Sequence, residues 1–264
     1  MYDFAYHKPK TLADAVALLK KQGEGKAMAG GMTLIPTLKQ RLARPSDVVD
    51  LGAIAELRGI KVDGSGVTIG AMTRHADVAS SAEIAKAIPA LASLAEHIGD
   101  GQVRNRGTIG SSVANNDPAA DYPGAVLALG ATIQTNERKI AADDFFKGLF
   151  ETALKDGELI TAISFPKPEK AAYMKFPNPA SRYAMVGVFV AKTAGGVRVA
   201  VTGAGSCVFR VKAMEDALAK NFSADAIKDI QIPSKDLNSD IHASPEYRAH
   251  LVNVMARRAV AAAG

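Results

Sequence analysis

The stretch AGGMTLIP at residues 29–36 and the stretch GTIGSS at residues 107–112 decide the fold of this chain. Each is a glycine turn that opens an expected helix. A glycine turn leaves backbone N–H groups free, and a helix N-terminus adds a favourable dipole, so such a turn suits an anion. One turn alone is weak evidence, because tight turns need glycine anyway. Two of them, the second followed by Asn115, Asp117 and Asp121, indicate a ligand with a diphosphate and sugar-like groups, which is a dinucleotide.

The composition fits a folded protein of a reducing compartment. The 264 residues are 48% hydrophobic and 22% charged, which allows two modest domains with packed cores. No apolar run approaches the roughly 20 residues that a membrane span needs, and no secretory signal is visible. Cys207 is the single cysteine, so this chain can form neither an internal disulfide nor a four-cysteine metal site. We therefore expect a cytoplasmic protein without a membrane span, and any iron–sulfur cluster on another chain.

The net charge of +5 does not indicate nucleic-acid binding. The basic residues are dispersed along the chain, and neither a basic run nor an aromatic platform accompanies them. A mildly basic surface fits an anionic cofactor or an acidic protein partner better.

The order of the expected elements predicts an α+β fold in two domains. We expect a first domain over 1–165, with subdomains of about 1–55 and 56–165, a boundary at the PKPEK stretch, and a second domain over 170–264. Helices are expected at 12–22, 33–41, 73–87, 90–98 and 245–263, and an apolar segment at 122–129. Two hairpins are expected, at 60–70 and 131–141. Further strands are expected at 26–29, 48–51, 159–165, 171–176, 183–191 and 197–202.

With both turns located, the chain resembles the FAD-binding medium subunits of the molybdenum hydroxylases, a family that includes aerobic carbon monoxide dehydrogenase and the flavin portion of xanthine dehydrogenase. Residues 29–34 are similar to the first FAD loop of the family. QVRNRGTIG at 102–110, continued by Asp117-Pro118 and Asp121, is similar to the second, and SDIHASPEYR at 239–248 to the C-terminal domain. The resemblance implies a two-part FAD-binding domain of the vanillyl-alcohol oxidase (PCMH) type, followed by a smaller α+β domain with a three-stranded antiparallel sheet plus helices.

The resemblance also implies the role of the chain. It would carry non-covalent FAD and act as an electron-transfer subunit. The enzyme that the resemblance favours is one like carbon monoxide dehydrogenase. A large subunit with the molybdenum cofactor would oxidise the substrate, and a small subunit with [2Fe–2S] clusters would pass the electrons on. The sequence fits this division, because we expect no catalytic or metal-binding residue in this chain. The acceptor would be a quinone or similar compound, and the assembly a dimer of heterotrimers. Two alternatives stay open: a stand-alone FAD-dependent reductase, and a non-catalytic nucleotide-binding module of the same fold.

The cofactor contacts that the resemblance implies fall into five groups. The first strand and loop would contribute Lys26, Ala27, Met28, Ala29, Gly30, Gly31, Met32, Thr33 and Leu34. The second loop would contribute Gly107, Thr108, Ile109, Gly110, Ser111 and Ser112, and the segment after it Asp117 and Asp121. The ends of the cofactor would contact Ile98, Ile160 and Lys175, and the flavin would be bordered by Tyr183.

Four of these residues have a second interpretation. Ser111 stands where the family has glycine; a positive φ there would cost on the order of 1–2 kcal/mol, unless a hydrogen bond from its hydroxyl to phosphate offsets the strain. Asp121 could instead cap the helix that begins at 122. Tyr183 could serve packing alone, and Lys175 could extend to solvent.

Overall fold

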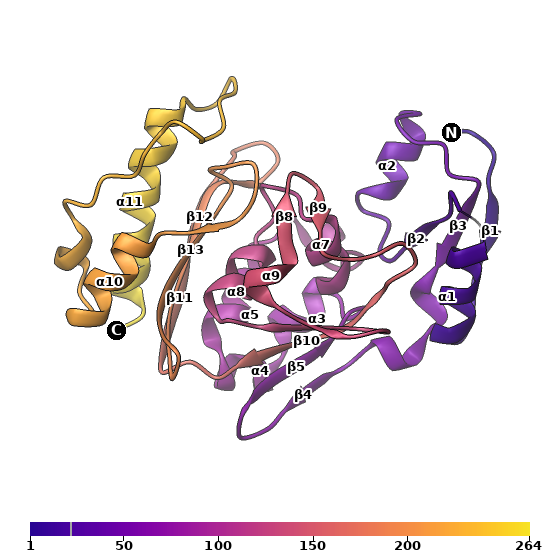
Figure 1. Cartoon of the computed structure of the whole chain (residues 1–264), viewed down its shortest axis with the longest axis horizontal. Helices are drawn as coiled ribbons and strands as arrows, with labels where there is room; N and C mark the ends of the chain where they lie inside the picture. The colour runs from indigo at the N-terminus through magenta and orange to yellow at the C-terminus, as the bar shows by residue number, and fades with distance from the viewer. Residues whose placement is uncertain (22) are drawn as a thin grey trace.

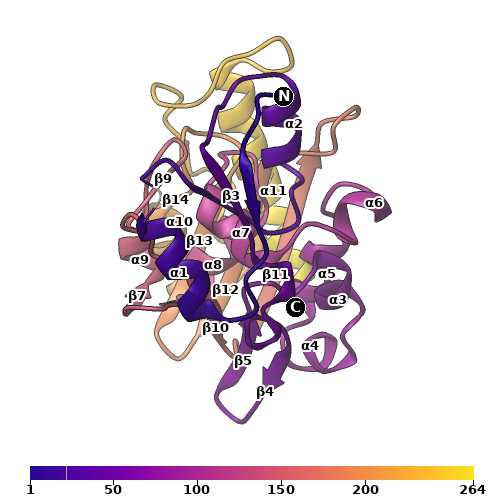
Figure 2. The same ribbon diagram turned by 90° about the vertical axis from the view of Figure 1, so that its right-hand side faces the viewer.

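The computed structural model describes residues 1–21 and 23–264, and it arranges them around three β-sheets and a short hairpin. Figure 1 shows a small N-terminal sheet at one end of the long axis, helices of the C-terminal part at the other end, and the remaining sheets and helices between them. Figure 2 shows the molecule from the N-terminal end, with α1 and α2 toward the viewer and the C-terminal helix α11 behind them. The mixed helix and sheet confirm the predicted α+β class.

The N-terminal sheet is parallel, with β3 (Asp47–Asp50) between β1 (Ala5–His7) and β2 (Lys26–Met28). Helix α1 (Leu12–Lys21) precedes β2, and α2 (Leu34–Lys39) follows it. Helix α1 begins at Leu12 as predicted, and Thr11 caps it, because its hydroxyl oxygen accepts a hydrogen bond from the backbone N–H of Asp14 at 3.1 Å. Parallel strands end at the same edge, so the first glycine stretch leaves the sheet beside the end of β3.

The central sheet is antiparallel in the order β4 (Ile60–Val62), β5 (Gly66–Gly70), β10 (Ile160–Pro166), β6 (Thr132–Thr135), β7 (Lys139–Ala141). Its helices are α3 (His75–Ser80), α4 (Ala82–Ala87), α5 (Pro89–Glu96), α6 (Gly101–Arg104), α7 (Ile109–Asn115), α8 (Tyr122–Ala128) and α9 (Ala142–Phe145), followed by the hairpin of β8 (Phe146–Gly148) and β9 (Glu151–Thr152). The single helix predicted over 73–87 is wrong. Ser81 adopts an extended backbone, and its hydroxyl accepts from the N–H of Ile84 at 3.2 Å to begin a new helix.

The third sheet contains the three predicted strands and one more. The order is β11 (Lys170–Pro177), β12 (Ala184–Thr193), β13 (Gly196–Thr202) and the short β14 (Phe209–Arg210), all antiparallel, so the predicted three-stranded sheet is corrected to four strands. Helices α10 (Lys212–Lys220) and α11 (Pro245–Ala262) follow. Alternate residues of β12 enter different hydrophobic clusters: Val188 packs in the cluster of α11, and Phe189 in that of α8. This burial on both faces explains the unbroken apolar run of β12.

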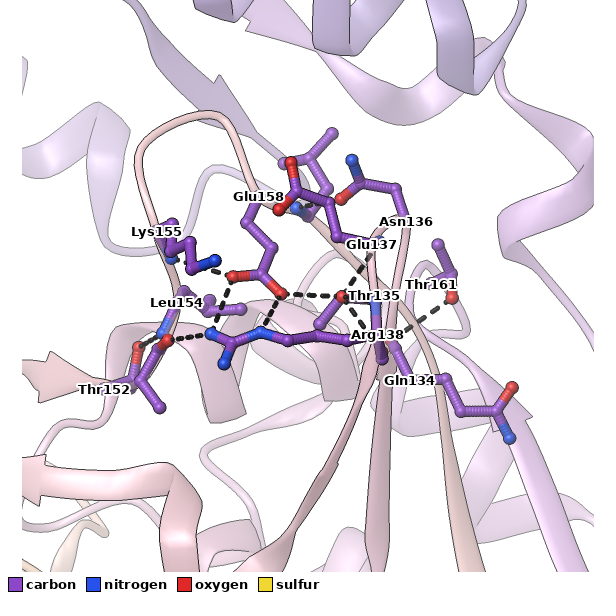
Figure 3. Close-up of polar contacts among 12 residues, drawn as sticks. Gln134, Thr135, Asn136, Glu137, Arg138, Thr152, Leu154, Lys155, Glu158 and Thr161 are labelled. Atoms are coloured by element: carbon purple, nitrogen blue, oxygen red, sulfur yellow. Dashed lines mark hydrogen bonds and ion pairs between the residues drawn. The ribbon is translucent and has the colours of Figure 1, made fainter.

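A buried carboxylate fixes the loop that leads into β10 (Figure 3). The carboxylate of Glu158 accepts hydrogen bonds from Arg138 Nε at 3.0 Å, from the Thr135 hydroxyl at 2.7 Å and from the backbone N–H of Lys155 at 2.9 Å. The hydrogen bond from the Arg138 guanidinium is the largest cause that lowers the pKa of Glu158 to about 2, so the side chain is an anion at neutral pH. The network joins the β6–β7 hairpin to the start of β10, where Ile160 lies.

Candidate functional site

The two glycine stretches meet in the structure. Gly31 has a φ of +76°, a conformation that glycine adopts without strain. A Cβ atom added to Gly30 would lie 1.9 Å from the carbonyl oxygen of Arg106 and 2.9 Å from the backbone nitrogen of Gly107. The backbone of the first stretch therefore packs directly against the backbone that enters the second, and this contact leaves no room for a side chain at residue 30.

The second stretch forms the N-terminus of α7. The Thr108 hydroxyl caps the helix by accepting from the backbone N–H of Ser111 at 3.4 Å, and the Ser111 hydroxyl donates to the Thr108 carbonyl at 2.9 Å. Ser111 lies inside the α-helix and is not among the residues with positive φ. The strain considered for a serine at this place is therefore absent, because the backbone here is helical and does not require glycine.

A cavity of about 180 Å³ lies where the two stretches meet. Four basic side chains and one carboxylate border it, so its charge favours an anionic group. The lining residues are Lys8, Ala29, Gly30, Asp50, Gly52, Arg58, Met72, Arg74, Asn105, Arg106 and Thr108. Three of the predicted residues, Ala29, Gly30 and Thr108, are among them.

The basic residues of this first cavity were missed as site residues. Arg106 belongs to the second family motif and could have been included on that signal. Lys8, Arg58 and Arg74 come from separate segments and follow no recognisable spacing, and only the fold brings them together.

A second cavity, of about 440 Å³, lies where three segments distant in the sequence meet. They are the continuation of the second glycine stretch, the turn between β11 and β12, and the segment that leads into α11. The lining residues are Asp117, Pro118, Ala119, Asn178, Ser181, Tyr183, Ala184, Met185, Gly203, Asn238, Asp240, His242 and Arg248. Tyr183 precedes β12, is 48% exposed and borders this cavity, and its contact with the flavin stays a prediction. The pKa of the Tyr183 hydroxyl is raised. Burial of part of the side chain is the largest cause, and the nearby carboxylate of Asp117 acts in the same direction.

Asp121 and Lys175, both predicted to contact the cofactor, contact each other. Lys175 Nζ lies 2.9 Å from Asp121 Oδ1, and the side chains of both residues are only 5% exposed. The Tyr173 hydroxyl donates to the same carboxylate at 2.5 Å, and Lys175 also donates to the carbonyl of His97 at 3.0 Å, next to Ile98. Burial raises the pKa of the Asp121 carboxyl, while the ammonium of Lys175 opposes this shift.

Two interpretations of these residues are therefore wrong. The carboxylate of Asp121 makes no hydrogen bond that caps α8, because it faces Tyr173 and Lys175 instead. Lys175 does not extend to solvent, because its ammonium is held between Asp121 and His97.

The remaining predicted residues occupy varied places. Lys26, Ala27 and Met28 form β2, Met32 and Thr33 are exposed on the loop after it, and Leu34 begins α2. Ile109, Gly110 and Ser112 belong to α7, and Gly107 packs over the imidazole of His75. Ile98 packs at the edge of the central core, and Ile160, 6% exposed, lies within that core. Ile160 borders neither of the two cavities, so its contact with the cofactor stays a prediction.

Within residues 1–21 and 23–264, the structure contains no group of three or more histidine, cysteine, aspartate or glutamate side chains placed to hold a metal ion. In the same part of the chain, no helix has the length and apolar character needed to cross a membrane.

Comparisons with known proteins agree along the whole chain. The family described as "FAD binding domain in molybdopterin dehydrogenase" matches residues 2–168. The chain is 36% identical over 273 residues to the nicotine 6-hydroxylase medium subunit of Paenarthrobacter nicotinovorans, covering 98% of this chain and 96% of the relative. It is 35% identical over 277 residues to the carbon monoxide dehydrogenase medium chain of Hydrogenophaga pseudoflava, with the same coverage of 98% and 96%. A solved structure of carbon monoxide dehydrogenase from the latter organism superposes with a TM-score of 0.90 at 36% identity, over 99% of this chain and 97% of the solved one.

Proposed function

This chain belongs to the family of FAD-binding domains in molybdopterin dehydrogenases, and on that premise we propose that it is the FAD-carrying electron-transfer subunit of a molybdenum hydroxylase. Its relatives are medium subunits of multi-subunit enzymes, so a large molybdenum-binding and a small [2Fe–2S] partner chain go with it. The observation that carries the proposal is the contact of Gly30 with the backbone of Arg106, because it joins the two glycine stretches at one cavity that basic side chains line.

The residues present fit FAD. N–H groups of the first glycine stretch and the basic side chains of the first cavity would hold the diphosphate. In the second stretch, the N–H groups of Gly107, Ile109 and Gly110 already donate to carbonyl groups of the protein. The flavin end would lie toward Ile98, the Asp121–Lys175 pair and Tyr183. FAD, when bound, supplies the ability to accept electrons from one carrier and to pass them to another. The chain itself binds and orients the cofactor, and Lys175 keeps a positive charge near the proposed ring position.

A quinone is the acceptor that we propose, in preference to a nicotinamide dinucleotide. The second cavity has carboxylates from Asp117 and Asp240, and its one arginine, Arg248, is paired with Asp240 at 2.6 Å. Such a lining disfavours the diphosphate of NAD and accepts an uncharged ring that forms hydrogen bonds. The sequence also lacks the Gly-x-Gly-x-x-Gly fingerprint of dinucleotide-binding Rossmann folds.

The finer organisation is part of the same proposal. We propose a dimer of heterotrimers in the cytoplasm, a carbon monoxide dehydrogenase-like enzyme, and domains over 1–165 and 170–264. The match of the family over residues 2–168 and the separate hydrophobic cluster of α10 and α11 support this division. The stand-alone reductase and the non-catalytic module are not favoured, because the relatives named above are subunits along nearly their whole length.

We expect the purified chain to carry FAD that is not covalently attached. Acid precipitation should release the yellow chromophore, and its mass should identify FAD and not FMN, because the first glycine stretch and the basic side chains of the first cavity suit a diphosphate. The same treatment after incubation with excess FAD serves as the control for cofactor lost in purification. A colourless protein that FAD cannot reconstitute would contradict the proposal.

A further inference from the structure

Arg248, in the first turns of α11, has a buried guanidinium group that reaches across to the third sheet. The residue is 3% exposed. Its Nη1 donates to the carbonyl of Met185 at 2.6 Å and to that of Gly203 at 3.1 Å, and its Nη2 donates to Asp240 Oδ2 at 2.6 Å. One charged group thus joins the start of β12, the end of β13 and the segment before α11.

The groups that Arg248 contacts are also tied to the second glycine stretch and its continuation. The backbone N–H of Gly203 donates to the carbonyl of Pro118 at 2.7 Å, and the N–H of Ala184 donates to the carbonyl of Ala119 at 3.4 Å. Asp240 in turn accepts from the N–H groups of His242 at 2.9 Å and Ala243 at 3.0 Å. The guanidinium therefore contacts two walls of the second cavity directly, at Met185 and Asp240, and is linked to the third, 117–119, through Gly203.

Packing alone does not explain a charge at this place. Helix α11 is held in its cluster by apolar residues such as Leu251, Val252 and Met255, none of which needs Arg248. Burial of a charge costs free energy that hydrogen bonds must offset, and an apolar residue of similar size often stabilises a fold as well or better. Arg248 does what an apolar residue cannot do, because its hydrogen bonds fix two carbonyl groups and one carboxylate in a single arrangement.

We propose that Arg248 is a positioning residue for the flavin, which acts by holding Tyr183 and the segment 117–119 in fixed places around the second cavity. This inference rests on the proposed function, because it takes the ring of FAD to lie beside Tyr183. Tyr183 is two residues from Met185, so loss of the Arg248 bonds frees the start of β12 and the side chain that borders the ring.

The test compares Arg248→Met, Arg248→Lys and Asp240→Asn with a matched control, Arg257→Met, on an exposed position of the same helix. We expect Arg248→Met to weaken FAD binding roughly tenfold, to raise the fluorescence of bound flavin, and to speed hydrogen exchange at the amides of Ala184 and Gly203. Arg248→Lys should restore part of each property, because the ammonium can still reach the two carbonyl groups. Asp240→Asn should give a smaller change, and Arg257→Met none.

The outcomes separate this proposal from the proposed function. A wild-type chain that binds no FAD overturns both. An Arg248→Met chain with normal FAD affinity and flavin fluorescence overturns the positioning role alone, whatever its melting temperature. If Arg248→Met fails to fold, Asp240→Asn decides, because it removes the charge of the carboxylate that pairs with the guanidinium; unchanged exchange, affinity and fluorescence in this variant overturn the role.

Discussion

Replacing Gly30 with alanine is expected to lower FAD affinity by on the order of 100-fold or more. The added Cβ would lie 1.9 Å from the carbonyl oxygen of Arg106, a backbone atom that no side-chain rotation can move away. The first stretch must then separate from the second, and the diphosphate loses the N–H groups of one side. Titration calorimetry with FAD on the folded apo chain measures the change.

Gly64→Ala is the matched control for this substitution. Gly64 lies in the turn of the β4–β5 hairpin, and an added Cβ would meet no atom within 4 Å. We expect the control to keep both its melting temperature and its FAD affinity. Wild-type affinity in the Gly30→Ala chain would mean that the contact between the two stretches does not hold the cofactor.

Asp121→Ala is expected to destabilise the chain and to weaken FAD binding together. Removal of the carboxylate leaves the buried ammonium of Lys175 without its ion-pair partner, which typically costs about 3–5 kcal/mol. For a chain of this size, such a loss lowers the melting temperature by roughly 10 °C or more. The Tyr173 hydroxyl loses its acceptor as well. Thermal unfolding of the apo chain and an FAD titration at low temperature measure the two effects separately.

The double variant Asp121→Ala/Lys175→Met separates stability from cofactor binding. It removes the uncompensated charge, so much of the lost stability should return, as it does when buried ion pairs are replaced as a unit. FAD affinity should stay low if the pair serves the cofactor. Recovery of wild-type affinity along with stability would show that the pair acts only in folding.

Local signals in the sequence predicted many of the secondary-structure elements. The structure confirms three predictions that depend on neighbouring residues alone. They are the start of a helix at residue 12, the hairpin over 60–70 and the apolar strand over 183–191. The break at Ser81 was not predicted, because helical periodicity continues across it while the serine hydroxyl starts a new helix. The fourth strand, β14, is only two residues long and has no period of its own.

The candidate site was predictable only where its residues follow one another in the chain. Both glycine stretches were found, whereas the partner of Asp121 lies 54 residues away and the carbonyl that Arg248 contacts lies 63 residues away. Such pairs leave no pattern in a single sequence, because the fold alone places them together. The strain considered at Ser111 depended on a backbone conformation that residue type cannot reveal.

The central claim is that this chain relays electrons through FAD and leaves substrate oxidation to its partners. The most direct measurement follows the flavin absorbance of the FAD-loaded chain under anaerobic conditions, first alone and then with its molybdenum and iron–sulfur partner chains. Alone, the flavin should stay oxidised with carbon monoxide, purines, aldehydes and N-heterocycles, yet give up electrons to a quinone once it is chemically reduced. In the complex, the enzyme's own substrate should reduce it. Rapid substrate turnover by the isolated chain would contradict this account.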